Sequence, residues 1–146
     1  MASIAIVYKS IHHSNTKKLL DVIRSVCKVD IFDVEEARHM DMSVYKAVGF
    51  ASGIYMSRLH ESIYEFLDEQ ESLPKKTFAI TTSGSKNKKY GLAFSDYLSK
   101  KDLEVLGVYS CKGFNTNGIF GIIGGIAKNH PNDSDMAAAI SFIKTL

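Results

Sequence analysis

A polar segment that could bind an anion begins at Ser10, which Lys9 separates from the apolar run IAIVY. Its sequence, SIHHSNT, covers residues 10–16 and leads into the helical pattern KKLLDVI. Amide groups at the start of a helix have no partner within the helix, and the helix dipole makes that end positive. Hydroxyl, amide and imidazole side chains can donate further hydrogen bonds there, and the adjacent lysines add positive charge. The segment therefore predicts an anion site that suits a phosphate group.

The same segment could instead be an ordinary polar turn, because Asn15 and Thr16 are residue types that cap helices well. It lacks the GxGxxG pattern of Rossmann dinucleotide sites, and it lacks the GxxxxGK pattern of P-loops. Two segments of small residues, SGIY at 52–55 and TSGS at 82–85, follow other apolar runs. Together these features favour a hydroxyl-rich anion site with two small-residue loops beside it.

Short apolar runs alternate with helical patterns, which predicts a single α/β domain over residues 1–146. The predicted strands cover 3–8, 29–34, 47–51, 76–81 and 103–111, and the predicted helices cover 16–26, 59–67, 90–98 and 134–146. The polar stretch 35–45 reads as a loop or a short helical turn.

The alternation predicts a parallel sheet, because parallel strands need long crossovers and the helices supply them. Ligands of such sheets bind outside the carboxyl ends of the strands, where the strand order reverses. This rule selects the segments 10–16, 52–55 and 82–85, which we expect to be loops at one edge of the sheet.

The charge, the apolar stretches and the spacing of cysteine and histidine residues argue against several classes of function. The formal net charge of the 146 residues is +2, and lysines are not interleaved with aromatic residues, so we expect no nucleic-acid partner. The apolar stretch 118–127 is shorter than a membrane helix and is interrupted by glycine, so we expect no membrane partner. Cys27 and Cys111 lack metal-ligand spacing, and His39 and His60 lack ligand partners, so no metal site is expected. Two thiols without a disulfide pattern predict a cytoplasmic protein.

On these residues the chain resembles the flavodoxin family, whose short members bind flavin mononucleotide (FMN). SIHHSNT occupies the place of the family's T-x-T-G-x-T loop, although it is about one residue longer and has Ser14 where glycine is usual. VGFASGIY and CKGF…IIGGIAKNHPND resemble a flavodoxin-like subgroup. The resemblance implies a flavodoxin-like three-layer α/β sandwich. Its five-stranded parallel sheet would have the order 2-1-3-4-5, with helices on both faces.

The resemblance also implies FMN as the cofactor and assigns residues to it by position. The first loop would hold the phosphate, and two further segments would flank the isoalloxazine ring. The implied FMN-binding residues are Ser10, Ile11, His12, His13, Ser14, Asn15 and Thr16 in the first loop, Ala51, Ser52, Gly53, Ile54 and Tyr55 along one wall, and Thr82, Ser83, Gly84 and Ser85 along the other.

Gly53 and Tyr55 carry the most specific expectations. In flavodoxins a peptide near the position of Gly53 rotates its carbonyl toward the reduced flavin, and glycine permits such rotation. Gly53 could equally serve only to allow a tight turn. Tyr55 could stack on the flavin ring or merely shield a helix start, and Tyr90 is a second stacking candidate.

Two classes of function remain open. The first is an FMN-binding redox protein, either an electron carrier or a small flavin-dependent oxidoreductase, whose partner is a redox protein or NAD(P)H. The slightly basic charge weighs against an ordinary flavodoxin carrier, because those are usually acidic. The second is a flavin-free flavodoxin-like domain that acts through protein contacts. A phosphorylated receiver is disfavoured, because Lys9 and Ser10 stand where its acidic cluster would lie.

Overall fold

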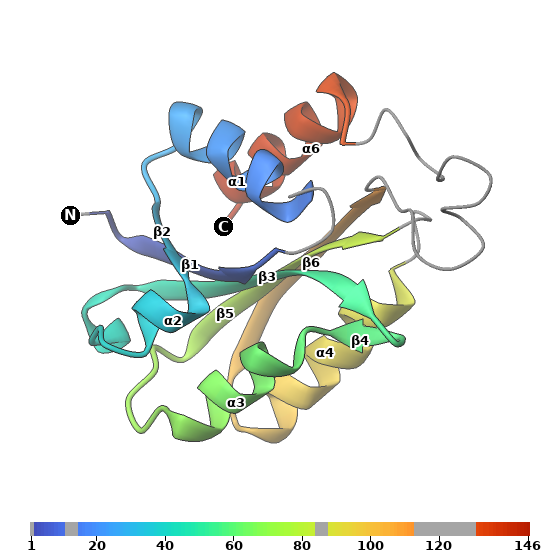
Figure 1. Ribbon diagram of the computed structural model, residues 1–146. Helices are drawn as coiled ribbons and strands as arrows, with labels where there is room; N and C mark the ends of the chain where they lie inside the picture. The colour runs from blue at the N-terminus through green and yellow to red at the C-terminus, as the bar shows by residue number, and fades with distance from the viewer. Residues whose placement is uncertain (1, 11–14, 84–87, 113–130) are drawn as a thin grey trace.

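The computed structural model describes residues 2–10, 15–83, 88–112 and 131–146 (Figure 1). Its strands are β1 (Ile4–Lys9), β2 (Asp30–Asp33), β3 (Ala47–Tyr55), β4 (Arg58–Leu59), β5 (Lys76–Ser83) and β6 (Glu104–Lys112). Its helices are α1 (Asn15–Val26), α2 (Val34–Ala37), α3 (Glu61–Glu69), α4 (Lys89–Lys100) and α6 (Asp133–Lys144), together with the short 3-10 helix η2 (Met42–Val44).

The main sheet has the strand order β2-β1-β3-β5-β6, and every neighbouring pair on this path is parallel. The order is the predicted 2-1-3-4-5 once the short β4 is left out of the count, so the fold prediction is confirmed. Chain order reverses between β1 and β3, where Tyr8 aligns with Ala51 and Lys9 with Ser52. The carboxyl ends of these two strands are where ligands of such sheets bind.

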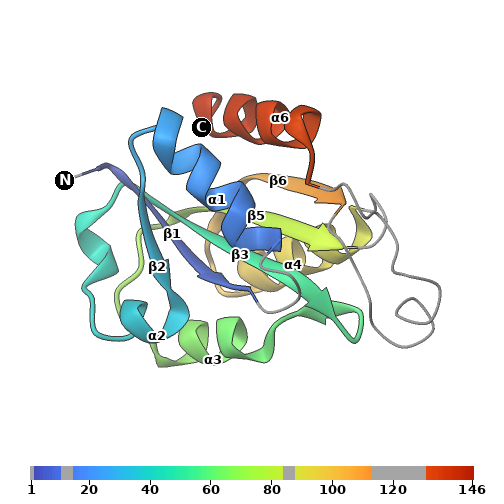
Figure 2. The ribbon, with the colours of Figure 1, turned by 45° about the horizontal axis from the view of Figure 1, so that its top comes forward.

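Helices cover both faces of the sheet, which makes three layers. Figures 1 and 2 show α1 and α6 together on one face, and α3 and α4 on the other. Each face has its own apolar core. Leu19, Ile23 and Ile143 pack with Ile6 and Ile80 beneath α1 and α6. On the other face the buried rings of Phe50, Phe66 and Phe94 pack together at centroid distances of 5.9 and 6.2 Å.

The third strand is longer than predicted. We expected the strand to end at Ala51 and residues 52–55 to form a loop, but β3 continues to Tyr55. Gly53 still pairs with Thr82 of β5, and Tyr55 then pairs with Arg58 of the antiparallel β4. Because both neighbours supply backbone partners, the segment is strand and the loop prediction is wrong.

Two other element boundaries also differ from the prediction. Leu59, predicted as the first helical residue, lies in β4, and α3 begins at Glu61. The stretch 35–45 contains the end of α2 and the 3-10 turn η2, each started by an aspartate side chain that accepts a backbone N–H. Of the third predicted loop, Thr82 and Ser83 are the last residues of β5.

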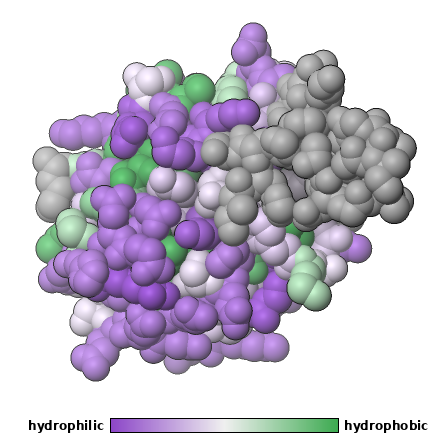
Figure 3. Space-filling view, in the orientation of Figure 1, coloured by the Kyte–Doolittle hydropathy of each residue, from purple (hydrophilic) through white to green (hydrophobic). Residues whose placement is uncertain are grey.

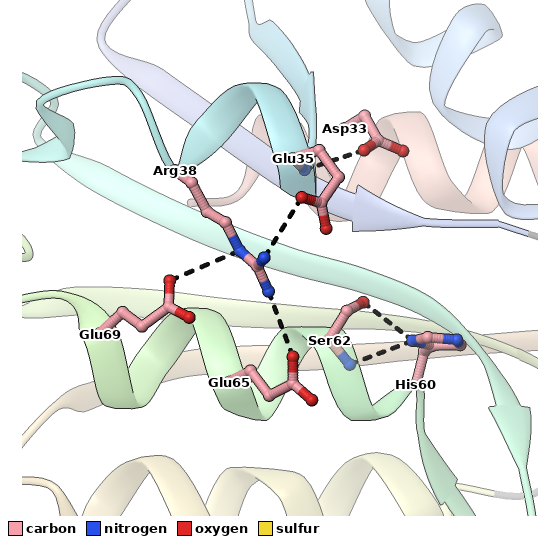
Figure 4. Close-up of polar contacts among 7 residues, drawn as sticks. All are labelled: Asp33, Glu35, Arg38, His60, Ser62, Glu65 and Glu69. Carbon is pink, nitrogen blue, oxygen red and sulfur yellow. Dashed lines mark hydrogen bonds and ion pairs between the residues drawn. The ribbon is translucent and has the colours of Figure 1, made fainter.

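An ionic cluster joins α2 to α3 on the face seen in Figure 1. Arg38, just after α2, lies 3.2 Å from Glu35, 3.2 Å from Glu65 and 3.5 Å from Glu69 (Figure 4). The arginine side chain is only 25% exposed, whereas the glutamates are about half exposed. Figure 3 shows that this part of the surface is strongly hydrophilic, which is consistent with a solvated acidic face.

Candidate functional site

The first and third predicted segments meet through two buried hydroxyl groups. Thr16, in the first turn of α1, and Thr82, near the end of β5, have side-chain oxygens 2.9 Å apart. The two residues are 1% and 3% exposed. A buried hydroxyl needs a partner, so this contact fixes the start of α1 over the carboxyl end of β5.

A second contact fixes the same helix start to the end of β1. The backbone N–H of Lys17 donates to the Ser10 hydroxyl at 3.3 Å, which makes Ser10 a side-chain acceptor for the first turn of α1. That turn contains no carboxylate, while Lys17 and Lys18 are exposed on it. The positive end of the helix dipole and the two ammonium groups therefore create a positive potential beside Ser10 and Thr16.

A second pair of small hydroxyl residues lies on the other face of the sheet, beneath α4. Thr81 and Ser110 are buried and their hydroxyl oxygens lie 2.7 Å apart, joining β5 to β6. Gly91 allows the start of α4 to lie directly on these strands, because an added Cβ would collide with the Val108 side chain. The start of α4 is consequently held close to the ends of β5 and β6.

One wall of the site comes from the end of β3. The buried Ser52 hydroxyl donates to the carbonyl oxygen of Gly53 at 2.6 Å and accepts the backbone N–H of His60 at 3.0 Å. Tyr55 folds back along its strand, so that a Cβ on Gly53 would lie 2.9 Å from the tyrosine hydroxyl oxygen. The missing side chain of Gly53 thus makes room for the Tyr55 ring.

The tight-turn interpretation of Gly53 is wrong, because Gly53 is a paired strand residue. The turn after β3 is made by Met56 and Ser57, whose φ angles are 52° and 67°. Non-glycine residues rarely adopt this left-handed region. Met56 is also 97% exposed at the tip of the hairpin.

His60 supports both this wall and the start of α3 (Figure 4). Its Nδ1 accepts the backbone N–H of Ser62 at 3.1 Å and lies 2.8 Å from the Ser62 hydroxyl. Its ring packs edge-on against Tyr55, with centroids 5.3 Å apart. Burial and the nearby ammonium of Lys9 lower the pKa of His60, so the neutral ring is favoured.

The structure brings together only part of the predicted residue set. Ser10, Thr16, Ser52, Gly53 and Thr82 gather where β1, β3 and β5 end. Ala51 and Ile54 belong to the same strand, but their side chains pack into the two apolar cores rather than into one wall. Asn15 and Ser83 are described at the start of α1 and the end of β5. Ile11, His12, His13, Ser14, Gly84 and Ser85 lie outside the described residues.

His60 is a site residue that the sequence did not predict. The sequence indicates only that His60 lacks metal-ligand partners, whereas in the structure its ring contacts Tyr55 and its backbone N–H contacts Ser52. In the sequence, a histidine directly before Glu61 indicates a helix cap only weakly. The contact with Tyr55 depends on the β3–β4 hairpin, which the sequence did not predict.

Within the described ranges, no cluster of three or more His, Cys, Asp or Glu residues could hold a metal ion. Among the same residues, no helix combines the length and apolarity needed to cross a bilayer.

Comparisons with known proteins agree with the fold. A family model described as a flavodoxin domain matches residues 5–109. An uncharacterized protein from Methanocaldococcus jannaschii is 39% identical over 143 residues, which cover 97% of this chain and 95% of that protein.

Solved structures of similar fold come from several bacteria. The Trp repressor binding protein from Bacillus subtilis has a TM-score of 0.68 at 15% identity, covering 98% of each chain. General stress protein 14 from Treponema denticola, solved in complex with FMN, has a TM-score of 0.62 at 10% identity, covering 99% of each chain. The chain also spans 36% and 34% of the length of two longer chains that it matches. At these identities the likeness shows the fold alone.

Proposed function

This chain belongs to the flavodoxin-domain family, and we propose that it is a redox protein that binds FMN at the carboxyl edge of its sheet. The observation that carries the proposal is the buried contact between Thr16 and Thr82, which places the start of α1 beside the ends of β1 and β5. When bound, FMN supplies the electron or hydride chemistry, and the protein supplies binding, orientation and electrostatics.

The donors at the start of α1 fit a phosphate group. The start of α1 carries the Ser10 hydroxyl, the amide groups of the first helical turn and the positively charged ammonium groups of Lys17 and Lys18. The Thr16 hydroxyl is buried against Thr82 and holds this turn in place. No carboxylate in the first turn opposes these positive charges. A dianionic phosphate ester gains most from such a set, because charge-assisted hydrogen bonds are about twice as strong as neutral ones.

The end of β3 fits one side of a flat ring. Tyr55 is half-buried, its hydroxyl end lies beside Gly53, and its ring packs nearly perpendicular to the His60 ring. We assign Tyr55 the stacking role in preference to Tyr90, which lies in the first turn of α4 beside the Lys89 ammonium, 5.0 Å from the ring centroid. Peptide rotation at Gly53 is not part of this proposal, because its carbonyl already accepts the Ser52 hydroxyl.

A binding experiment tests the proposal. The purified protein is denatured and the supernatant is analysed for FMN, and the refolded apoprotein is then titrated with FMN while flavin fluorescence is recorded. We expect one FMN per chain and weaker binding by Thr16→Val. Thr77→Val is the matched control, because Thr77 is also buried and hydrogen-bonded on β5, at the opposite end of that strand. A folded apoprotein that binds no FMN would support the flavin-free domain instead.

A further inference from the structure

Exposed lysines gather around the edge of the sheet where the candidate site lies. Lys17 and Lys18 lie in the first turn of α1, Lys88 and Lys89 at the start of α4, and Lys112 is the last residue of β6. All five are exposed, and we call them the lysine rim. The arrows of β1, β3, β5 and β6 in Figure 1 point toward this edge, so residues distant in the chain share one end of the molecule.

The helix dipoles do not explain the lysine rim, although Lys17 forms an i,i+4 ion pair with Asp21 at 3.4 Å. Positive charge at a helix N-terminus is unfavourable, because it opposes the positive end of the helix dipole. The other described helices follow the usual rule, since α2, α3 and α6 all carry carboxylates in their first turns. By contrast, α1 and α4 have no acidic residue there, and the N-cap residue of α4 makes no side-chain capping bond. The two exceptions are the two helices that start beside the candidate site.

Negative charge is concentrated along α2 and α3, although α3 begins next to the candidate site, at Glu61. Glu35 and Glu36 on α2, and Glu61, Glu65 and Glu69 on α3, are exposed. These glutamates lie on the α3 side of the sheet, and Arg38 neutralises them only in part (Figure 4). The chain therefore separates its charges, although its formal net charge is only +2. Such separation orients an approaching charged molecule.

We propose that the lysine rim is the docking face for a partner protein with a carboxylate-rich surface. This inference rests on the proposed function, because a partner docked at the lysine rim would exchange electrons with FMN bound at the same edge of the sheet. The spread of the lysines favours a protein over NAD(P)H, since the charges cover the start of two helices and the end of β6 rather than one pocket.

The physical consequence is electrostatic steering. Opposite charges spread over two faces raise the association rate and fix the mutual orientation of the partners. Salt weakens both effects, because the Debye length falls to about 3 Å at 1 M ionic strength. Docking on the lysine rim is therefore expected to be tight at low salt and weak at high salt.

The test uses a plant-type ferredoxin, which is a small acidic redox protein, as the probe. Its affinity for the full-length protein is measured by isothermal titration at about 20 mM and about 500 mM salt. We compare wild type with the double variant Lys88→Glu/Lys112→Glu. The matched control is Lys46→Glu/Lys75→Glu, which makes the same charge change at exposed positions before β3 and β5, at the opposite edge of the sheet.

We expect salt-sensitive binding to wild type and to the control variant, and a Kd raised about tenfold or more by the rim variant. Equal weakening by both variants would show that only net charge matters and would overturn the inference. Absent ferredoxin binding would overturn it too. The inference would also be overturned if NADPH or a short DNA duplex bound to the lysine rim while ferredoxin did not. FMN titration of the wild-type protein separates the two proposals, because absent FMN binding contradicts the proposed function, whereas FMN binding without docking contradicts only the lysine rim.

Discussion

The hydroxyl oxygens of Thr16 and Thr82 lie 2.9 Å apart, although 66 positions separate the two residues in the chain. Both residues are buried, so neither hydroxyl can exchange its partner for bulk water without opening the structure. The pair joins the first turn of α1 to the end of β5. The contact therefore contributes to folding stability and also fixes the geometry of the candidate site.

Replacing either threonine by valine tests this pairing. Thr16→Val or Thr82→Val leaves one buried hydroxyl unsatisfied, and we expect each to lower the free energy of unfolding by about 1–3 kcal/mol. The double variant leaves no hydroxyl unsatisfied, so its loss is expected to be no larger than that of one single variant. Urea unfolding of the four proteins measures the coupling. Additive losses would contradict the contact.

Two glycines on β3 are predicted to respond differently to alanine. At Gly49 the new Cβ would collide with the buried ring of Phe78, so Gly49→Ala is expected to destabilise the fold by about 1–3 kcal/mol. At Gly53 it would lie 2.9 Å from the Tyr55 hydroxyl oxygen, at the far end of a side chain that can move. We therefore expect Gly53→Ala to displace the Tyr55 ring at little cost in stability.

Thermal unfolding and NMR chemical shifts distinguish these outcomes. The shifts of the Tyr55 and His60 rings should change in Gly53→Ala and stay unchanged in Gly49→Ala if that variant folds. A large loss of stability in Gly53→Ala would mean that the Tyr55 ring is rigidly held.

The pH dependence of stability is predicted from His60. Burial and Lys9 lower its pKa below the ordinary value of 6.5, whereas Glu61 and Glu65 act in the opposite direction. The unfolded chain binds this proton more readily, so the contribution is complete above about pH 6.5 and is lost as the pH falls through the folded-state pKa. Protonation would also require Nδ1 to stop accepting the Ser62 N–H.

His60→Asn is the control, because asparagine caps helices but does not titrate in this range. The stability of wild type relative to this variant should fall as the pH falls below 6.5. NMR titration of the ring gives the pKa directly. A value at or above 6.5 would refute the prediction.

Removing the Arg38 guanidinium is predicted to loosen α2 from α3. Arg38→Gln leaves Glu35, Glu65 and Glu69 without their shared cation, and we expect a loss of about 1 kcal/mol that shrinks at high salt. Arg24→Gln is the control, because Arg24 forms an exposed pair with Asp21 that should contribute about 0–0.5 kcal/mol. Urea unfolding at low and high salt measures both. Equal effects of the two variants would contradict a shared cluster.

The sequence predicted the sheet well because its strands are buried, apolar and separated by helical patterns. It failed at residues 52–55, where serine and glycine suggested a loop. Local residue type could not show that Ser52 and Gly53 still have partners in β5. The hairpin was also hidden, because its turn residues, Met56 and Ser57, are neither glycine nor asparagine.

The candidate site was only partly predictable for the same reason. Ser10 and Thr16 follow from their place between a strand and a helix, and the structure places both beside other strand ends. The side-chain directions of Ala51 and Ile54 depend on which face of an extended strand they occupy. The roles of His60 and Tyr55 depend on contacts between β3 and the start of α3, which no local pattern encodes.

The most direct test of the account compares the affinity of the apoprotein for FMN with its affinity for riboflavin, which lacks the phosphate. If the start of α1 binds the phosphate, wild type should favour FMN, and Asn15→Ala/Thr16→Ala should reduce that preference by about tenfold or more, since a hydrogen bond to a charged group contributes about 1.5–3 kcal/mol. Equal loss of affinity for both flavins, or no preference in wild type, would contradict the claim that this helix start holds the phosphate.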